Sequence, residues 1–129
     1  MNKTEHKVEE TGAQRDTDDN KPPVHLLSPL VLLRVSMWKG KGAKEYGENN
    51  WMNGFKASRL VSCAFRHLLK YMLGMKDEDH LSACITNLMF IMHLETTKPE
   101  LMDLVTYDPA VIEGFMSRVD DWFGKEENE

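Results

Sequence analysis

Polar side chains that could bind a ligand gather in the middle of the sequence. A loop rich in asparagine and glycine spans residues 42–51, and two apolar helical segments beyond it carry Arg66, His67 and Asn87. Burying a polar group without a partner costs roughly 1–3 kcal/mol, so a small protein that keeps several on apolar faces has a use for them. We therefore expect a ligand site built from this loop and these helices.

Arg66 and His67 form the first pair of candidate residues. Neighbouring positions of a helix point about 100° apart, so the two side chains could bind one anionic group at the helix edge, with the guanidinium as a bidentate donor. His67 also follows Leu60 and Ala64 at helical spacing. That spacing favours the alternative of a core histidine hydrogen-bonded to a backbone carbonyl.

Asn87, Asp79 and the loop aromatics each allow two interpretations. Asn87 interrupts an apolar run, so its amide either bonds to the neighbouring helix or faces a ligand, as a base-reading or metal-linked group. Asp79 is expected to cap the helix that follows it, and a carboxylate there could also bind a hard cation. Tyr46 and Trp51 either close the loop over the core or offer a flat surface on which a nucleobase stacks.

The first helix that must position these groups is marked by its capping residues. Ser28 can cap it with Pro29 at its first position, and the glycines within residues 39–42 should weaken it before the loop. Glu45 and Glu48 have an ExxE spacing, but the glycine between them disfavours a continuous helical pair of carboxylates.

Two further helices should form an antiparallel hairpin. We expect them over residues 56–73 and 80–96, with Gly74 ending the first of the two. A last amphipathic helix is expected within residues 111–123. No segment has a convincing strand pattern, so the expected fold class is all-α. The packing stripe of the 80–96 helix is expected at Leu81, Ile85, Leu88, Met89 and Met92.

The ends of the chain differ in composition from its middle. Residues 1–24 contain almost no large apolar side chain and should form a flexible leader, because they cannot bury enough area to offset the entropy of ordering. The helical domain is expected over residues 25–124, followed by an acidic tail at 125–129.

Composition sets limits on the protein's class. The 129 residues suit one domain, and a formal net charge of −5 argues against a protein that coats duplex nucleic acid, which needs a basic face. The chain shows no CxxC unit and no signal peptide, and its longest apolar run, near residues 88–94, is too short to span a bilayer. We expect a soluble protein with free thiols in a reducing cytoplasm and no membrane partner.

The order of these motifs resembles the bacteriophage dATP/dGTP diphosphohydrolase family, which is compared with the MazG-type all-α nucleotide pyrophosphohydrolases. The resemblance covers residues 29–95 and includes GAKEYGENNW from residue 42, RHLL from residue 66 and DHLSA from residue 79. Many relatives carry a second histidine three residues after the first one of the last motif, where this chain has Ala83. The positions that agree with the family pattern are Gly42, Ala43, Lys44, Tyr46, Gly47, Asn50, Trp51, Arg59, Arg66, His67, His80, Leu81 and Asn87.

This resemblance implies a MazG-like helical bundle that hydrolyses the purine deoxynucleoside triphosphates dGTP and dATP to a monophosphate and pyrophosphate. It also implies a divalent metal, Mg²⁺, Mn²⁺ or Co²⁺, and a role in nucleotide-pool control in the cytoplasm of a phage-infected host. The wider superfamily presents ExxE and ExxD carboxylates to its metals, so the ligand set of this chain must be reduced or rearranged.

The resemblance also implies roles for single residues. Hydrolysis of a phosphoanhydride needs neutralised phosphate charge, an oriented water and a site for the base. The implied substrate-binding residues are Lys44, Tyr46, Asn50, Trp51, Arg59, Arg66 and Asn87. The implied catalytic residues are His67, Asp79 and His80, and the implied metal ligands are Glu48, Asp79 and His80.

Two other functions stay open on the sequence. One is a nucleotide-binding or regulatory protein that has lost its catalytic carboxylates. The other is a helical interaction protein acting on a host partner, which the amphipathic last helix and the charged ends favour. In each case we expect a homo-oligomer, because a two-helix hairpin is too thin to bury all of its apolar faces.

Overall fold

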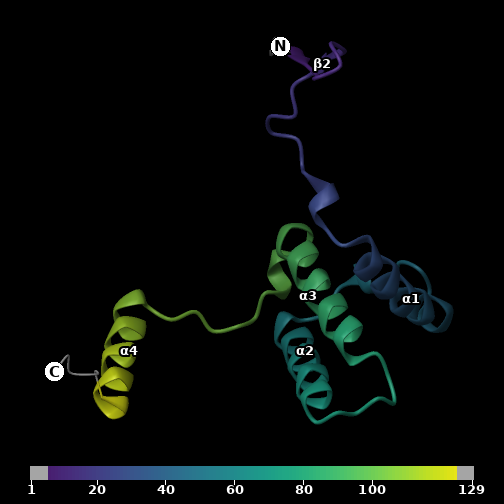
Figure 1. The fold of residues 1–129 in the computed structure, drawn as a ribbon. Coiled ribbons are helices and arrows are strands. Elements are labelled where there is room, and N and C mark those ends of the chain that lie inside the picture. Colours follow the sequence, from purple (N-terminus) through teal and green to yellow (C-terminus); the bar gives the residue numbers. More distant parts are fainter. Residues whose placement is uncertain (1–5, 125–129) are drawn as a thin grey trace. The chain divides into compact units, whose positions relative to one another are not determined.

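The structure is a computed structural model that describes residues 6–124. The acidic tail expected at residues 125–129 lies outside the described residues. The elements, labelled in Figure 1 where there is room, are β1 (His6–Val8), β2 (Gln14–Asp16), η1 (Val24–Leu26), α1 (Pro29–Tyr46), η2 (Asn50–Asn53), α2 (Ala57–Met72), α3 (His80–Thr97), η3 (Pro99–Leu101) and α4 (Pro109–Phe123). Among residues 6–124, no helix combines the length and the apolarity that crossing a bilayer requires. Contacts divide the chain into one unit that ends at Leu33 and a second that starts at Arg34.

The described residues are mostly helical, as expected, but the N-terminal unit adds an antiparallel hairpin, so the fold is not purely α and the expectation of a flexible leader was wrong. His6 pairs with Asp16 and Val8 pairs with Gln14. The connecting turn is closed by a 2.8 Å hydrogen bond from the Gly12 amide to the Glu9 carbonyl, with Gly12 at a φ of 91°. Every side chain of both strands is exposed. Backbone bonds hold this hairpin, and they leave no apolar pattern in the sequence.

Helix α1 begins where the capping residues predict and ends later than expected. The Val31 amide lies 3.4 Å from the Ser28 hydroxyl oxygen, which accepts its hydrogen bond at the helix start. The helix continues through Gly40 and Gly42 to Tyr46, so the expected weakening at residues 39–42 does not end it. A glycine inside a helix costs about 1 kcal/mol relative to alanine, which neighbouring turns can outweigh. The chain leaves the helix at Gly47, whose φ is 96°.

Helices α2 and α3 lie side by side and run in opposite directions, which confirms the predicted hairpin to within about one residue at each end. The buried residues of α3 include Ser82, Ala83 and Thr86, and those of α2 include Leu60 and Ala64. Small side chains on both helices let the two backbones approach closely.

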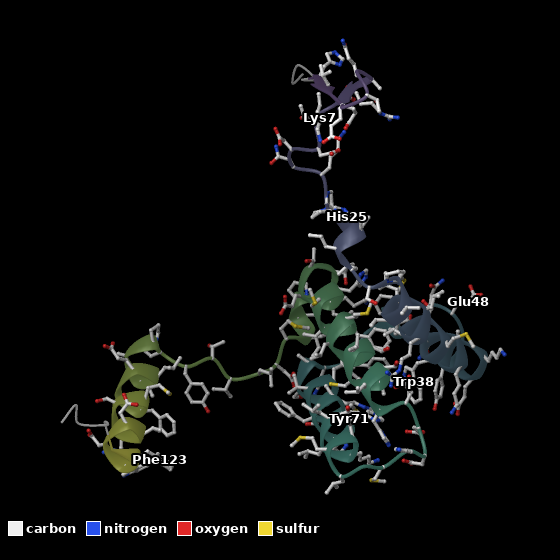
Figure 2. The ribbon with its side chains drawn as sticks, viewed as in Figure 1. Lys7, His25, Trp38, Glu48, Tyr71 and Phe123 are labelled. Atoms are coloured by element: carbon white, nitrogen blue, oxygen red, sulfur yellow. The ribbon has the colours of Figure 1, made fainter. Side chains whose placement is uncertain are left out.

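The packing stripe expected on α3 was wrong. Ile85, Leu88, Met89 and Met92 are all exposed and Leu81 is half-buried, whereas the buried residues of α3 are His80, Ser82, Ala83, Thr86 and Leu94. Apolar residues lie on every side of α3, so their spacing could not identify the face that packs. Side chains of the chain are drawn in Figure 2.

A distant carboxylate caps the start of α2. The Ser58 amide donates a 2.8 Å hydrogen bond to Oδ1 of Asp103, and the Ser58 hydroxyl donates a 2.6 Å bond to Oδ2. These bonds, led by the one from the hydroxyl, hold the pKa of Asp103 below its ordinary value. They also fasten the segment after η3 to the first turn of α2.

The turn before α2 requires a glycine. Gly54 has a φ of 100°, and a Cβ atom added there would collide with the side chain of Leu101. Since the backbone conformation and the neighbouring side chain both oppose a larger residue, this position fixes how the loop enters α2.

We predict that Gly54→Ala destabilises the protein by about 1–3 kcal/mol, because it adds backbone strain and a steric clash. Gly40→Ala is the matched control, since Gly40 lies inside α1 and an added Cβ would meet nothing within 4 Å. That control should stabilise the protein by about 0.5–1 kcal/mol. Urea unfolding followed by circular dichroism measures both changes, and equal stability of the two variants would contradict the prediction.

Candidate functional site

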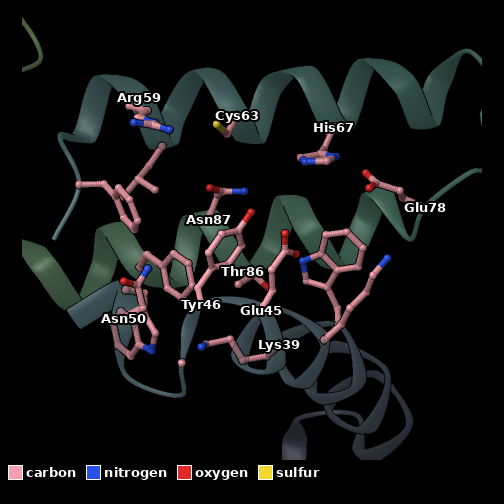
Figure 3. Close-up of a pocket in the computed structure, with 18 residues that line it drawn as sticks. Lys39, Glu45, Tyr46, Asn50, Arg59, Cys63, His67, Glu78, Thr86 and Asn87 are labelled. Atoms are coloured by element: carbon pink, nitrogen blue, oxygen red, sulfur yellow. The ribbon is translucent and has the colours of Figure 1, made fainter. Parts of the chain in front are cut away.

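A cavity of about 430 Å³ opens between the second half of α1, the loop that follows it, α2 and α3. All of its lining residues belong to the unit that starts at Arg34. This volume lies within the range of small-molecule sites in proteins, roughly 300–1,000 Å³. Figure 3 shows the side chains that point into it.

Helix α1 contributes an acidic and a phenolic group. Glu45 and Tyr46 both extend from the end of α1 into the cavity (Figure 3). A hydrogen bond with the Glu45 carboxylate, followed by the charge of that carboxylate, raises the pKa of the Tyr46 hydroxyl above its ordinary value. The phenol therefore stays protonated and is available as a hydrogen-bond donor.

Asn87 supplies a partly free amide on α3. Its Nδ2 donates a 2.8 Å hydrogen bond to the Ala83 carbonyl one turn earlier in the same helix. The hydrogen bond to the neighbouring helix, which the sequence analysis gave as one alternative for Asn87, is therefore not formed. One N–H and the carbonyl oxygen of the amide are left for a ligand, and the side chain lines the cavity.

Stacked rings form one wall of the cavity. The indole of Trp51 lies parallel to Phe90, with ring centroids 4.8 Å apart, and the edge of His93 approaches it at 4.7 Å. Nζ of Lys39 lies 5.7 Å from the Trp51 ring and donates to the Glu48 carbonyl at 3.3 Å. One face of Trp51 is thus already covered by Phe90, which fixes the loop against α3.

Positive charge reaches the cavity from two helices. Lys39 and Lys41 come from α1, and Arg59 comes from α2. The Lys41 amine lies 5.5 Å from the ring of Trp38, and the Arg59 guanidinium lies 5.7 Å from the ring of Phe55. Aromatic neighbours hold these cations at the edge of the cavity, where they could attract an anionic group.

Two histidines meet at the other end of the cavity. Nδ1 of His67 lies 2.9 Å from Nδ1 of His80, and Nε2 of His80 lies 2.8 Å from Oδ1 of Asp77. Because a carboxylate accepts hydrogen bonds, this network places a proton on Nε2 of His80 and leaves its Nδ1 as an acceptor. The bond to His80 also lowers the pKa of Asp77, which keeps that carboxylate charged.

His67 faces the cavity from α2. Its ring lies edge-on to Trp38, with ring centroids 6.2 Å apart. Burial, followed by electrostatic repulsion from His80, lowers the pKa of His67 below its ordinary value. The imidazole is therefore neutral at pH 7 and can offer a lone pair.

His67, Glu78 and His80 form a group that could hold a metal ion. Each offers one ligand atom, and these atoms lie within 4.8 Å of one another. His80 is buried, His67 is half-buried and Glu78 is exposed, so the group extends from the helix interface to the mouth of the cavity. Figure 3 shows His67 and Glu78 at the same end of the site.

Asp79 is occupied by structural contacts. Its carboxylate accepts two 2.8 Å hydrogen bonds from the Arg34 guanidinium, and it caps α3 by accepting from the amide of Ser82 at 3.2 Å and its hydroxyl at 2.7 Å. The bond from Arg34 is the main cause of a pKa far below the ordinary value. Of the two roles that the sequence allows, the helix cap is the one observed. The arrangement gives no support to Asp79 as a metal ligand.

The structure brings together only part of the residue set expected from the sequence. Tyr46, Asn50, Trp51, Arg59, His67 and Asn87 line the cavity, and His80 lies directly behind His67. The lining does not include Lys44, Glu48 or Arg66. Glu48 is exposed on the loop after α1 (Figure 2), and the guanidinium of Arg66 lies 3.1 Å from Sγ of Cys63.

Sequence reasoning missed several lining residues. Lys39 and Lys41 lie in the stretch where α1 was expected to weaken, and Glu45 was set aside with its ExxE spacing. Asp77 and Glu78 lie just before α3, in a segment from which only Asp79 and His80 were expected in the site. A helix that continued through the two glycines would have placed Trp38, Lys41 and Glu45 on one face, at spacings of three and four residues.

We predict that Arg34→Ala and Asp79→Asn each lower the melting temperature, and that the double variant melts no lower than Asp79→Asn alone. Asparagine still caps a helix, so the substitution at Asp79 mainly removes the charge that pairs with Arg34. Glu95→Gln, at an exposed position of α3, is the control and should leave the melting temperature unchanged. Strictly additive losses, measured by calorimetry, would show that the ion pair contributes nothing.

Comparison with known proteins identifies the family. A relative described as a dATP/dGTP diphosphohydrolase, from Salmonella phage PMBT28, is 30% identical over 87 residues, which are 64% of this chain and 30% of that protein. The chain thus spans about a third of the length of this relative. No solved structure matches the chain. The sequence model of the family described as "dATP/dGTP diphosphohydrolase, N-terminal" matches residues 11–104. Since this match covers well over half of the chain, the protein belongs to the dATP/dGTP diphosphohydrolase N-terminal family.

Proposed function

We propose that this protein hydrolyses purine deoxynucleoside triphosphates to a monophosphate and pyrophosphate. Water would add at the α-phosphorus and give up a proton, while the bond from that phosphorus to the oxygen that bridges to the β-phosphate breaks. Pyrophosphate would leave on that oxygen with the electron pair of the broken bond. Family membership over residues 11–104, together with a cavity that combines an amide, aromatic rings and cations, is the observation that carries the proposal. We also propose that the helices form a bundle like that of the MazG-type hydrolases.

The base would lie against the aromatic wall. Trp51 and Phe90 are stacked on each other and offer a flat aromatic surface to a base. The Asn87 amide keeps one donor and one acceptor free. A purine offers a π-face and an edge with both hydrogen-bonding types, so it matches these groups. Tyr46 and Asn50 lie in the same lining and complete the proposed substrate-binding set.

The phosphates would lie among the cations. Lys39, Lys41 and Arg59 all line the cavity and could neutralise the charge of a triphosphate. Lys44 and Arg66, implied by the resemblance, lie outside the lining, and their roles stay predictions. A bound divalent cation, Mg²⁺, Mn²⁺ or Co²⁺, would add charge neutralisation and make water a better nucleophile.

His67 is the group best placed to act on water. Its neutral imidazole lines the cavity, and its Nδ1 is held by His80, which in turn is held by Asp77. We assign His67 to orienting the attacking water and His80 to positioning His67. Asp79 we assign to fixing α3, not to catalysis.

A nucleotide-binding protein without turnover is the second candidate. One observation favours it: of the lining residues only Glu45 and Glu78 carry a carboxylate, which is a small set for a phosphoanhydride hydrolase. Calorimetric binding of dGTP without release of pyrophosphate would support this alternative. Action in phage nucleotide-pool control and the expected homo-oligomer stay predictions, and light scattering of the purified chain tests the latter.

We predict pyrophosphate release from dGTP and dATP above that from dCTP and dTTP in the presence of Mg²⁺, Mn²⁺ or Co²⁺. Arg59→Ala should lower kcat/KM by about 10–100-fold, the usual effect of losing a charge-assisted bond to phosphate. Arg118→Ala, at an exposed position of α4, is the matched control and should keep wild-type kinetics. Absence of pyrophosphate with every nucleotide and metal would remove the enzymatic proposal.

A further inference from the structure

We propose that His67, Glu78 and His80 form a site for one divalent transition ion of the Zn²⁺ or Co²⁺ class, and that this site discriminates against Mg²⁺. The catalytic meaning of such a site rests on the proposed function, whereas binding of the ion does not. The ligand set differs from the one implied by the resemblance, which named Glu48 and Asp79 together with His80.

The two imidazoles already point a ring nitrogen at each other. Their Nδ1 atoms face each other at 2.9 Å. Two nitrogens bound to the same ion at about 2 Å each would lie roughly 3.3 Å apart in a tetrahedral site, so only a small outward shift is needed. At most one proton can lie between the two nitrogens, and an ion would replace it.

The outer contact of His80 prepares it as a ligand. His80 is 2% exposed, and its Nε2–H donates to Asp77 at 2.8 Å, which directs the lone pair of Nδ1 at His67. Histidines that bind metals usually donate their other N–H to a carboxylate or a carbonyl in this way, because the contact fixes the ring and its tautomer. The carboxylate–histidine pair is therefore an observation independent of the spacing of the ligand atoms.

Glu78 supplies the third ligand and the negative charge. It is exposed in the turn before α3, and its ligand oxygen already lies within 4.8 Å of the ligand nitrogens of the imidazoles, so a change of rotamer could bring it onto a shared ion. Asp79, the next residue, cannot serve instead, because both of its oxygens accept hydrogen bonds from Arg34.

The location leaves room for substrate on the ion. His67 and Glu78 both line the cavity, so an ion held by them would have its remaining coordination positions on the cavity side. Three protein ligands with one open position are typical of catalytic zinc sites, whereas structural sites use four. A water or a phosphate oxygen could take that position.

The donor set decides which ion is preferred. Two imidazole nitrogens and one carboxylate suit Zn²⁺, Co²⁺ or Ni²⁺. Mg²⁺ prefers oxygen ligands in octahedral geometry and loses its water shell reluctantly, so a site with two nitrogens binds it poorly.

Titration of the metal-free full chain with ZnCl₂, CoCl₂ or MgCl₂, without nucleotide, tests this proposal. We expect one Co²⁺ or Zn²⁺ per chain, with an affinity at least about 100-fold above that for Mg²⁺. Bound Co²⁺ should give the visible absorption bands of a four-coordinate site with nitrogen ligands. Binding of no ion, or equal affinity for Mg²⁺ and Co²⁺, would overturn the proposal.

Variants identify the ligands. Glu78→Gln and His67→Ala should each weaken Co²⁺ binding by at least about 10-fold, and Asp77→Asn by about 10–100-fold through the loss of the outer contact. His25→Ala is the matched control, because His25 is exposed in η1 of the N-terminal unit and should leave the titration unchanged. Circular dichroism shows whether a histidine variant misfolds. Glu78 is exposed, so Glu78→Gln should keep the fold and still test the site in that case.

The two proposals fail in distinguishable ways. Tight Co²⁺ binding that Glu78→Gln abolishes, without any release of pyrophosphate, would end the hydrolase proposal and support the metal site. Pyrophosphate release by the wild-type chain, with Glu78→Gln and His67→Ala both keeping the wild-type Co²⁺ affinity, would end the metal site and support the hydrolase.

Discussion

The ion pair between Arg34 and Asp79 is the constraint on which the candidate site depends. Two 2.8 Å hydrogen bonds join α1 to the first residues of α3, and the same carboxylate caps α3 through Ser82. The cap sets where α3 begins and therefore where His80, its first residue, points. The bond to Arg34 holds α1 against that end, which brings Trp38 and Glu45 to the cavity. The ion pair is partly exposed, so it adds little to the free energy of folding, and its main effect is to fix the positions of α1 and α3.

Close contact between α2 and α3 completes the arrangement. Ala64 on α2 and Ala83 and Ser82 on α3 are all buried, and small residues at a helix interface shorten the distance between the axes. Larger side chains at these places would separate His67 from His80, whose nitrogens are 2.9 Å apart. The same interface that forms much of the core thus sets the distance between the two imidazoles. Stability and site geometry are therefore coupled here, and a substitution in this interface would change both.

Local signals in the sequence predicted the helices well and their surroundings poorly. Ser28 with Pro29, and Asp79, located the starts of α1 and α3 because caps act within one turn. The hairpin at residues 6–16 escaped detection because backbone bonds between exposed strands leave no apolar pattern. Tyr46, Asn50 and Trp51 were placed in the site from their loop, and they line the cavity. The partner of Asp79 could not be predicted, because Arg34 lies 45 positions away and nothing local links the two.

Three neighbouring acidic residues show most clearly what sequence alone cannot separate. Asp77 accepts from His80, Asp79 accepts from Arg34, and Glu78 between them reaches the cavity. In the sequence they form one acidic turn, which would ordinarily be interpreted as a solvated cap. In the structure the two aspartates accept hydrogen bonds from a histidine and an arginine of the fold. Glu78 is the member of the turn that lines the cavity, so its carboxylate is the one available to a ligand there.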